Sequence, residues 1–280
     1  MSMLPLMESL SADVKFAARS LLKSPGLLAV VVLSLALGIA ANSTIFSVLN
    51  AVLYRPLPYP QPQNLVAIWQ TELGQPDSLD APPIAEELDW EKQNHVFEDI
   101  SLSSQTDTNI ANGSSGPRLM HVQYVTPNFF HQLGVEPILG RVFHVDEAQD
   151  LSQTIVISTP FWKREYNSDP QVLGKTIDLE GNVSTIVGVM PAGFAPFYGV
   201  PIDLWEPVNP ANPRYVARMD HWLMPVGRLK TGVTMAQAQR EMDIIARRLE
   251  QQYPTINKGW GKRLVPLHQQ LFGWASRALY

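Results

Sequence analysis

The residues closest to a nucleotide-binding motif are Gly174, Lys175 and Thr176, which match the last three positions of a phosphate-binding loop. Such a loop needs a glycine five residues before Gly174, and that position holds Asp169. The loop must also lead into a helix, whereas the residues that follow predict a strand. We therefore interpret these residues as a turn and expect that the chain does not itself bind ATP.

The six histidines do not have the spacing of metal ligands, because none forms an HxH or HExxH pair. His144 lies near Asp146 and Glu147, which would suit a metal ion, but we favour a surface loop there. The chain has no cysteine, which excludes disulfides, thiolate metal sites and cysteine nucleophiles together. We expect no metal ion and no cofactor.

No nucleophile or acid pair stands out either. The run Gly113-Ser114-Ser115-Gly116 fails the GxSxG order and follows no apolar strand, so it reads as a flexible loop. Asp203 and Glu206 flank Trp205, and nothing marks either carboxylate as a perturbed acid, so we place them on a subdomain rim. The sequence thus predicts no catalytic residues, and we expect that the protein is not an enzyme.

Aromatic side chains concentrate in the middle of the chain, where they could form either a ligand surface or the core of a subdomain. We favour the core, because large aromatic residues are usually buried. The residues concerned are Phe129, Phe130, Phe161, Trp162, Phe194, Phe197 and Trp205.

The elements that position these residues begin with an apolar segment at 26–53, where no charged residue occurs. Its length exceeds the roughly 20 residues that a helix needs to cross the hydrocarbon core, so we predict one transmembrane helix. Lys15, Arg19 and Lys23 precede it, which places the N-terminus in the cytoplasm and the remainder outside. A signal peptide cleaved after residues 38–40 is the rival interpretation, opposed by the structured basic region before the segment and the apolar residues after it.

Two short parts of this region carry more specific expectations. Residues 1–25 have Leu10, Val14, Ala17 and Leu21 at helical spacing, which predicts an amphipathic helix at the cytoplasmic surface. Inside the apolar segment stand the polar residues Asn42, Ser43 and Thr44. They either contact another membrane helix or lie near the hydrated headgroups, and the sequence leaves both open.

The remainder predicts an α+β extracytoplasmic domain, entered through a proline-rich exit at 55–62. Strands at 65–70 and 100–104 enclose a helix at 82–96, which makes one β-α-β unit. Strands at 221–229 and 263–267 enclose a helix opened by the capping box of Thr234 and Gln237, which makes a second. Two such units commonly pair into one split ferredoxin-like sheet.

The middle of the chain has shorter, more β-rich patterns. We predict strands at 119–125, 154–158, 176–179 and 184–189, and short helices at 127–133 and 160–166, each opened by proline. The expected organisation is a subdomain formed by 54–117 and 210–271, an inserted β-rich subdomain at 118–209, and a tail at 272–280. The net charge of −5 without a basic cluster excludes nucleic acid as the main partner.

Several strings, in this order, resemble the first transmembrane helix and the periplasmic core domain of MacB/FtsX-like ABC transporter permeases, over about 10–271. They are LALGIAANSTIFSV at 35–48, LYRPLPY at 53–59, NFF, LGV and GRVF within 128–143, IS, W and GKT within 157–176, and VGVMPAGF at 187–194. The most similar subgroup is the duplicated orphan permeases, which lack a fused ATPase.

This resemblance implies a permease component, or a fragment of one, of an export or efflux system in the bacterial inner membrane. It implies mechanotransmission, in which a separate cytoplasmic ATPase drives helix motions and porter-like and inserted outer subdomains follow. The segment with Val14, Phe16, Arg19 and Leu21 would couple to that ATPase. Other permease segments or a second permease copy are the further partners implied.

One departure from the family pattern concerns the membrane part. Family members continue with three further membrane helices, whereas the printed sequence ends at Tyr280, so we expect 272–280 to be a truncated tail. The alternative function is a single-span anchored scaffold or sensor domain without transport activity. A secreted enzyme is a third and weaker reading, because no catalytic arrangement was found.

Overall fold

A computed structural model of the 280-residue chain describes residues 25–49, 57–110, 118–144, 153–179, 181–194, 197, 200–212, 218 and 220–277. The chain divides into two compact units. One consists of residues 1–55 with 278–280, and the other is Pro56–Arg277.

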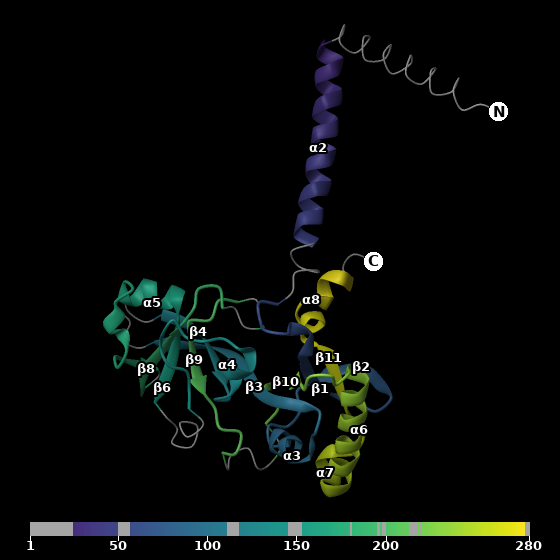
Figure 1. Ribbon diagram of the computed structural model, residues 1–280, viewed down its shortest axis with the longest axis vertical. Helices are drawn as coiled ribbons and strands as arrows, with labels where there is room; N and C mark the ends of the chain where they lie inside the picture. The colour runs from purple at the N-terminus through teal and green to yellow at the C-terminus, as the bar shows by residue number, and fades with distance from the viewer. Residues whose placement is uncertain are drawn as a thin grey trace, which may run out of the picture. The chain divides into compact units, whose positions relative to one another are not determined.

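The first unit contains one long helix, α2 (Pro25–Leu49) (Figure 1). It has no charged residue, and most of the large apolar side chains described on it are exposed. The most exposed are Val30, Leu33, Leu35, Leu37, Ile39 and Phe46. None of the helices in the described part of the chain is both long enough and apolar enough to cross a membrane.

The second unit is built on one continuous sheet, whose first part comes from both ends of the unit. Its strands are β1 (Leu65–Glu72), β3 (Phe97–Ile110), β10 (Met224–Leu229) and β11 (Trp260–Pro266). They lie in the order β11-β1-β10-β3, and every neighbouring pair is antiparallel. This order places the two later strands on either side of β1, so the two β-α-β units are interleaved.

Two helices cover one face of this part of the sheet. They are α3 (Glu86–Gln93), between β1 and β3, and α6 (Met235–Gln252), between β10 and β11. The side chains of Trp90 on α3 and Met242 on α6 pack with Val66 and Ile68 of β1. Figure 1 shows these helices at one end of the unit, with α7 (Pro254–Asn257) following α6. We call this packing the helix-side core.

The inserted part extends the same sheet beyond β3. Its order is β4-β9-β6-β8-β5, and β7 pairs with β8 and with the end of β3. The strands are β4 (Arg118–Val125), β5 (Leu139–Gly140), β6 (Thr154–Ser158), β7 (Thr176–Leu179), β8 (Asn182–Met190) and β9 (Leu204–Pro207). Helix α5 (Thr159–Tyr166) packs on this part through Phe161, against Ile155 and Ile186.

The second face of both parts is buried in a common cluster, which we call the junction core. It contains Leu65 and Val226 from the first part and Val156 and Trp205 from the inserted part. Its remaining members come from α4 (Phe129–Leu133), α8 (Leu267–Arg277), the segment before β1 and the residues near 190–202, together with Val125, Phe143 and Met224. The two parts of the sheet are therefore joined by a shared interior as well as by hydrogen bonds.

Most predicted elements are confirmed, and the differences have physical reasons. Strands at 154–158 and 176–179 have the predicted bounds, and the capping box of Thr234 and Gln237 is present. The helix expected at 82–96 begins only at Glu86, because residues 84 and 85 form a turn and the Ile84 amide donates to the Asp220 carbonyl. The strand expected at 221–229 begins at Met224.

Other elements were not predicted. They are β2 (Gln75–Asp80), an edge strand paired to β1, the short strands β5 and β9, the 3-10 turns η2 (Pro62–Asn64) and η4 (Pro170–Val172), and α8. Helix α8 covers part of the stretch expected to be a tail at 272–280. The amphipathic segment predicted at 1–25 lies outside the described residues, apart from Pro25 at the start of α2.

Candidate functional site

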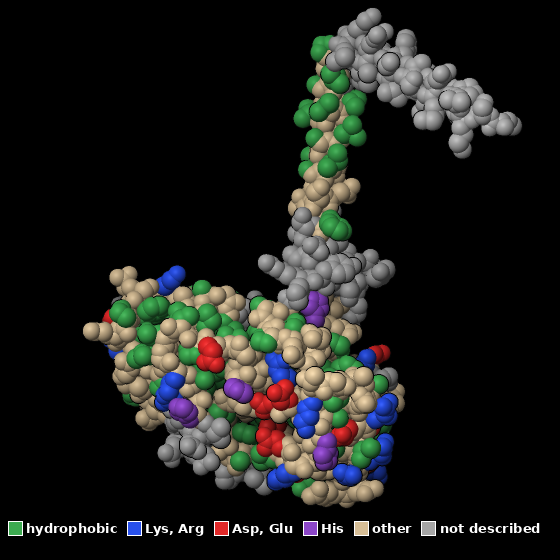
Figure 2. Space-filling view, viewed as in Figure 1, with side chains coloured by type: hydrophobic (Ala, Val, Ile, Leu, Met, Phe, Trp, Pro, Cys, Tyr) green, Lys and Arg blue, Asp and Glu red, His purple; other side chains and the backbone are tan. Residues whose placement is uncertain are grey.

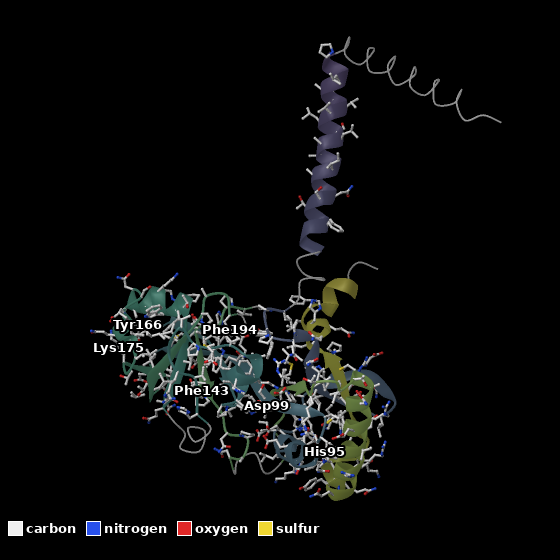
Figure 3. All side chains as sticks on the ribbon, in the orientation of Figure 1. His95, Asp99, Phe143, Tyr166, Lys175 and Phe194 are labelled. Carbon is white, nitrogen blue, oxygen red and sulfur yellow. The ribbon has the colours of Figure 1, made fainter. Side chains whose placement is uncertain are left out.

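The segment that leads into β1 is anchored in the junction core. The side chains of Leu57 and Tyr59 are buried, and the ring of Tyr59 meets those of Phe194 and Phe197 edge-on, with centroids 6.4 and 6.3 Å apart. Burial raises the pKa of the Tyr59 phenol. Phe194 and Phe143 are labelled in Figure 3. Movement of this segment would therefore displace aromatic residues of the inserted part.

Helix α4 is tied to the first part of the sheet by one buried amide. The Nε2 atom of Gln132 donates to the carbonyl oxygens of Asp99, at 3.0 Å, and Val226, at 2.7 Å. Its Oε1 atom accepts a hydrogen bond from the Ser101 hydroxyl. Because these carbonyls belong to β3 and β10, the amide holds α4 over the border between two strands.

Arg228 of β10 links α4 to the entering segment. Its Nε atom donates to the Gln132 carbonyl at 2.8 Å, and its Nη1 atom donates to the Pro60 carbonyl at 2.9 Å. Burial lowers the pKa of this guanidinium, and Glu98 and Asp99 oppose that shift. One cation thus connects three backbone segments that are far apart in the sequence.

Gly134 brings the same segments into close contact. It ends α4 with φ of 65°, and a Cβ atom added there would lie 2.7 Å from Cγ of Pro60. A glycine suits both requirements, because it adopts left-handed backbone easily and has no side chain. We call Pro60, Gln132, Gly134 and Arg228 the linkage site.

A second feature of this region is a cleft of about 420 Å³ between the two parts of the unit. It is lined by Glu87, Leu88 and Glu91 of α3, by Asp99 of β3, and by residues 126–128 and 209–211. We call it the acidic cleft. Burial, followed by the charge of Glu91, raises the pKa of Glu87 well above its usual range.

Asp99, near the start of β3, accepts hydrogen bonds from neighbouring donors. Its Oδ1 atom accepts hydrogen bonds from Asn128 Nδ2, at 2.6 Å, and from the Ile100 amide, at 3.0 Å. Burial raises the pKa of Asp99, while these two donors act in the opposite direction. Asn128 also donates to the Ile100 carbonyl at 2.7 Å, so the turn before α4 is fixed to β3.

A buried ion pair fixes α3 behind this cleft. The Nζ atom of Lys262 on β11 lies 2.7 Å from Oε2 of Glu86 and donates to Gln70 Oε1 at 3.0 Å. Asn257 donates to the other oxygen of Glu86. Burial lowers the pKa of Lys262, and Glu86 opposes the shift. The N-terminal turn of α3 therefore has a fixed position on the sheet.

The residues predicted to act in the membrane lie elsewhere. Asn42, Ser43 and Thr44 are exposed on α2, and the Thr44 hydroxyl donates to the Ala40 carbonyl within the helix at 2.8 Å. The predicted coupling residues Val14, Phe16, Arg19 and Leu21 lie outside the described residues.

The residues considered for catalysis or binding in the sequence mainly make structural contacts. Gly174-Lys175-Thr176 leads into β7, as predicted for a turn, and Lys175 pairs with Asp169 at 2.6 Å. Asp203 pairs with Arg164 at 2.8 Å. Over the described residues, no group of three or more histidine and carboxylate side chains could hold a metal ion. His144 is described, but its neighbours Asp146 and Glu147 are not.

The prediction that the aromatic residues form a core is confirmed for the buried members. Phe129, Phe130, Phe197 and Trp205 lie in the junction core, and Phe161 lies in the core of the inserted part. Trp162 and Phe194 are partly buried against these clusters.

The linkage site and the acidic cleft were not predicted. Arg228 and Pro60 are 168 residues apart, and no local pattern relates them. A signal for the cleft was present, because Glu87 and Glu91 are four apart on a predicted helix and like charges at that spacing repel.

Comparison with known proteins gives a consistent result. The model of the MacB-like periplasmic core domain family matches residues 28–245. No curated protein matches the chain. Three solved structures share the fold at low sequence identity.

The first is a domain of a protein described as a permease from Porphyromonas gingivalis, with 15% identity, a TM-score of 0.56, and coverage of 75% of this chain and 92% of that one. The second is the periplasmic region of MacB from Actinobacillus actinomycetemcomitans, with 11% identity, a TM-score of 0.54, and coverage of 78% and 93%. The third is the extracellular domain of the noncanonic ABC-type transporter YknZ from Gram-positive bacteria, with 12% identity, a TM-score of 0.51, and coverage of 72% and 100%.

Proposed function

The chain belongs to the family of MacB-like periplasmic core domains, and from this premise we propose that it is a permease component of a MacB-like ABC export or efflux system. In this proposal the domain Pro56–Arg277 is extracytoplasmic and performs no catalysis. A separate cytoplasmic ATPase supplies the energy, and the domain transmits the resulting motion. The porter-like subdomain would comprise 54–117 and 210–271, and the inserted subdomain 118–209.

The proposed anchor is the whole stretch 26–53, which continues past the end of α2. Support comes from α2, on which most of the described large apolar side chains are exposed, Leu37 by 76% and Leu33 by 69%. Such a surface is unfavourable in water, at about 25 cal/mol per Å² of exposed apolar area. Lys15, Arg19 and Lys23 before the stretch favour a cytoplasmic N-terminus in the inner membrane.

The observation that carries the proposal of transmission is the linkage site. Arg228 and Gly134 attach the segment that follows the proposed anchor to α4, and Gln132 attaches α4 to β3 and β10. A displacement of the segment at Pro60 would therefore reach both parts of the sheet through hydrogen bonds and packed rings. Contiguous chains of packed side chains and hydrogen bonds of this kind are one means by which coupling between distant sites is carried.

The topology can be tested directly, because the chain has no cysteine. We expect a membrane-impermeant maleimide to label Glu136→Cys in intact cells and to label Ser11→Cys only after the membrane is permeabilised. Both positions are single substitutions in an otherwise thiol-free protein. Labelling of Ser11→Cys in intact cells would contradict the proposed orientation.

The ATPase partner requires a second experiment. We expect the tagged full chain, purified from membranes of its own host with ATP and vanadate present, to retain an ABC-type ATPase. Substitution of Phe16 and Arg19 by alanine should reduce that recovery, whereas alanine at Ser11 should not. Absence of any ABC ATPase from the purified chain would instead favour the anchored scaffold or sensor domain.

A further inference from the structure

The acidic cleft has the form of a binding site for a small group. Its volume of about 420 Å³ falls within the range for small-ligand sites. The wall residues combine three carboxylates with the apolar side chains of Leu88, Pro127 and Pro210. Figure 2 shows acidic side chains gathered on this face of the unit, where Figure 3 labels Asp99.

One carboxylate in the cleft lacks a donor. Glu87 is only 3% exposed, and among the described residues no group donates a hydrogen bond to its Oε2 atom. Its side chain contacts that of Glu91, which is also a carboxylate. Two carboxylates hydrogen-bond to each other only while one of them holds a proton, so when both are ionised a donor from a bound ligand would satisfy the pair.

The charges around Glu87 leave this need unmet. Glu91 of α3 and Asp99 of β3 act on Glu87 with negative charge. The positive groups of this region act on Asp99 instead, namely His131 of α4 and Arg228 of β10. The hydrogen bonds of Arg228 go to the carbonyl oxygens of Gln132 and Pro60, outside the cleft lining. Buried carboxylates without a matched cation are expensive, which favours a positively charged ligand.

We propose that the acidic cleft binds an organic cation through an ammonium or guanidinium group that donates hydrogen bonds to Glu87 and Asp99. The apolar stem of such a ligand packs against Leu88, Pro127 and Pro210. A divalent metal ion fits less well, because calcium takes six to eight oxygen ligands, and the described residues offer no metal-binding group. The source is either a free amine or a lysine or arginine side chain of a polypeptide.

Binding of this kind displaces a proton. Burial and the neighbouring Glu91 raise the pKa of Glu87, so its carboxyl holds a proton at pH values where an exposed glutamate is ionised. An adjacent cation lowers that pKa and releases the proton. Because an ammonium group keeps its charge up to about pH 10, the affinity must rise with pH through the titration of Glu87 rather than of the ligand.

Titration calorimetry on the full chain, in an uncharged detergent, tests this inference. The probes are 1,5-diaminopentane and Nα-acetyl-lysine methylamide, with calcium chloride as a comparison. Measurements in two buffers of different ionisation enthalpy report proton release. We expect saturable binding of an amine with release of up to one proton, and an affinity that rises by up to about tenfold per pH unit over the titration of Glu87.

Matched variants separate the site from the general charge of the domain. Glu87→Gln should weaken binding about tenfold or more and remove proton release, because an amide keeps the shape but neither charge nor proton. Asp99→Asn should weaken binding without removing proton release. Glu136→Gln removes one negative charge at an exposed position outside the cleft and should leave both the affinity and the proton release unchanged.

The two amine probes distinguish the source of the ligand. Binding of the diamine alone identifies a free amine, and equal binding of the lysine derivative identifies a side chain.

Any of three results would overturn the inference. These are a wild-type chain that binds neither amine saturably, a Glu87→Gln variant that binds an amine as tightly as the wild type, and displacement of the amines by calcium. The variants Glu87→Gln and Asp99→Asn keep hydrogen-bonding groups in place, and their unfolding transitions show whether they are folded. None of these results bears on membrane topology or on ATPase recovery, so the cleft and the transmission role can fail separately.

Discussion

Replacing Lys262 with methionine should destabilise the outer domain more than any change of comparable size on its surface. The Lys262 side chain is 1% exposed, and that of its partner Glu86 is completely buried. The Lys262 ammonium lies 2.7 Å from the Glu86 carboxylate, 3.0 Å from Gln70 Oε1 and 5.8 Å from the centre of the Trp90 ring. Methionine fills similar space but leaves the Glu86 charge buried without a counterion.

The magnitude follows from that uncompensated charge. Removing one partner of a buried pair costs about 3 to 5 kcal/mol. For a domain of this size, each kcal/mol shifts Tm by about 2 to 4 °C. We therefore expect Lys262→Met to lower Tm by about 6 to 20 °C. Replacing both partners, as Lys262→Met with Glu86→Leu, should restore most of the loss, because no buried charge remains.

The assay is thermal and denaturant unfolding of the full chain in detergent, for the wild type, both single variants and the double variant. Lys258→Met, at an exposed lysine, is the control and should change stability by less than about 0.5 kcal/mol. Additive losses in the double variant, or a loss below about 1 kcal/mol in Lys262→Met, would refute the reasoning.

Three further predictions concern other positions in the domain. Gly134→Ala should lower the free energy of unfolding by more than the 1 to 2 kcal/mol or so of left-handed backbone, because its Cβ meets Pro60, whereas Gly193→Ala, with positive φ and open space, should lose only that amount. Thr234→Ala should cost about 1 kcal/mol in urea unfolding through loss of the capping box of α6. Burial raises the pKa of Glu87 above 4.5, so the folded state binds the extra proton, and wild-type stability is lost as pH rises through that pKa. The free energy of unfolding, measured across pH, should therefore rise for Glu87→Gln relative to the wild type as the pH increases. A difference that does not change with pH would contradict the raised pKa of Glu87.

The elements that the sequence predicted well are those with local signals. Helix α6 has both a capping box and a regular apolar face, so its start and its buried side were predicted. Strands β6 and β7 are short and apolar between turn residues, and their bounds were predicted as observed. These features depend on neighbouring residues only, which is why one sequence is enough.

Other elements depend on distant partners. The second half of β3 is polar, with Gln105, Thr106 and Asp107, and it is a strand because it pairs with β4 over its full length. Strand β9 has only four residues and lies between β4 and β6. Hydrogen bonds to strands distant in the sequence determine the second half of β3 and strand β9, so the periodicity of the sequence does not predict either.

The candidate sites follow the same division. The pair Glu87 and Glu91 was visible as two acids on one helical face, although the other residues that line the cleft were not. The linkage site was not visible at all, because Gln132 and Arg228 look like ordinary polar residues until α4 and β10 are placed together. Long-range backbone acceptors cannot be inferred from residue type.

The interleaved strand order also determines when the domain can fold during synthesis. Both strands that flank β1 come from residues beyond 223, so Val66 and Ile68 remain without their main partners until almost the whole domain has been made. The inserted part can pair its own strands earlier, because β6, β7 and β8 follow one another closely in the chain. Closing the first part last carries a long-loop entropy cost and leaves apolar strands exposed in the incomplete chain. A nascent chain of this protein therefore depends on protection of its first β-α-β unit for most of its emergence.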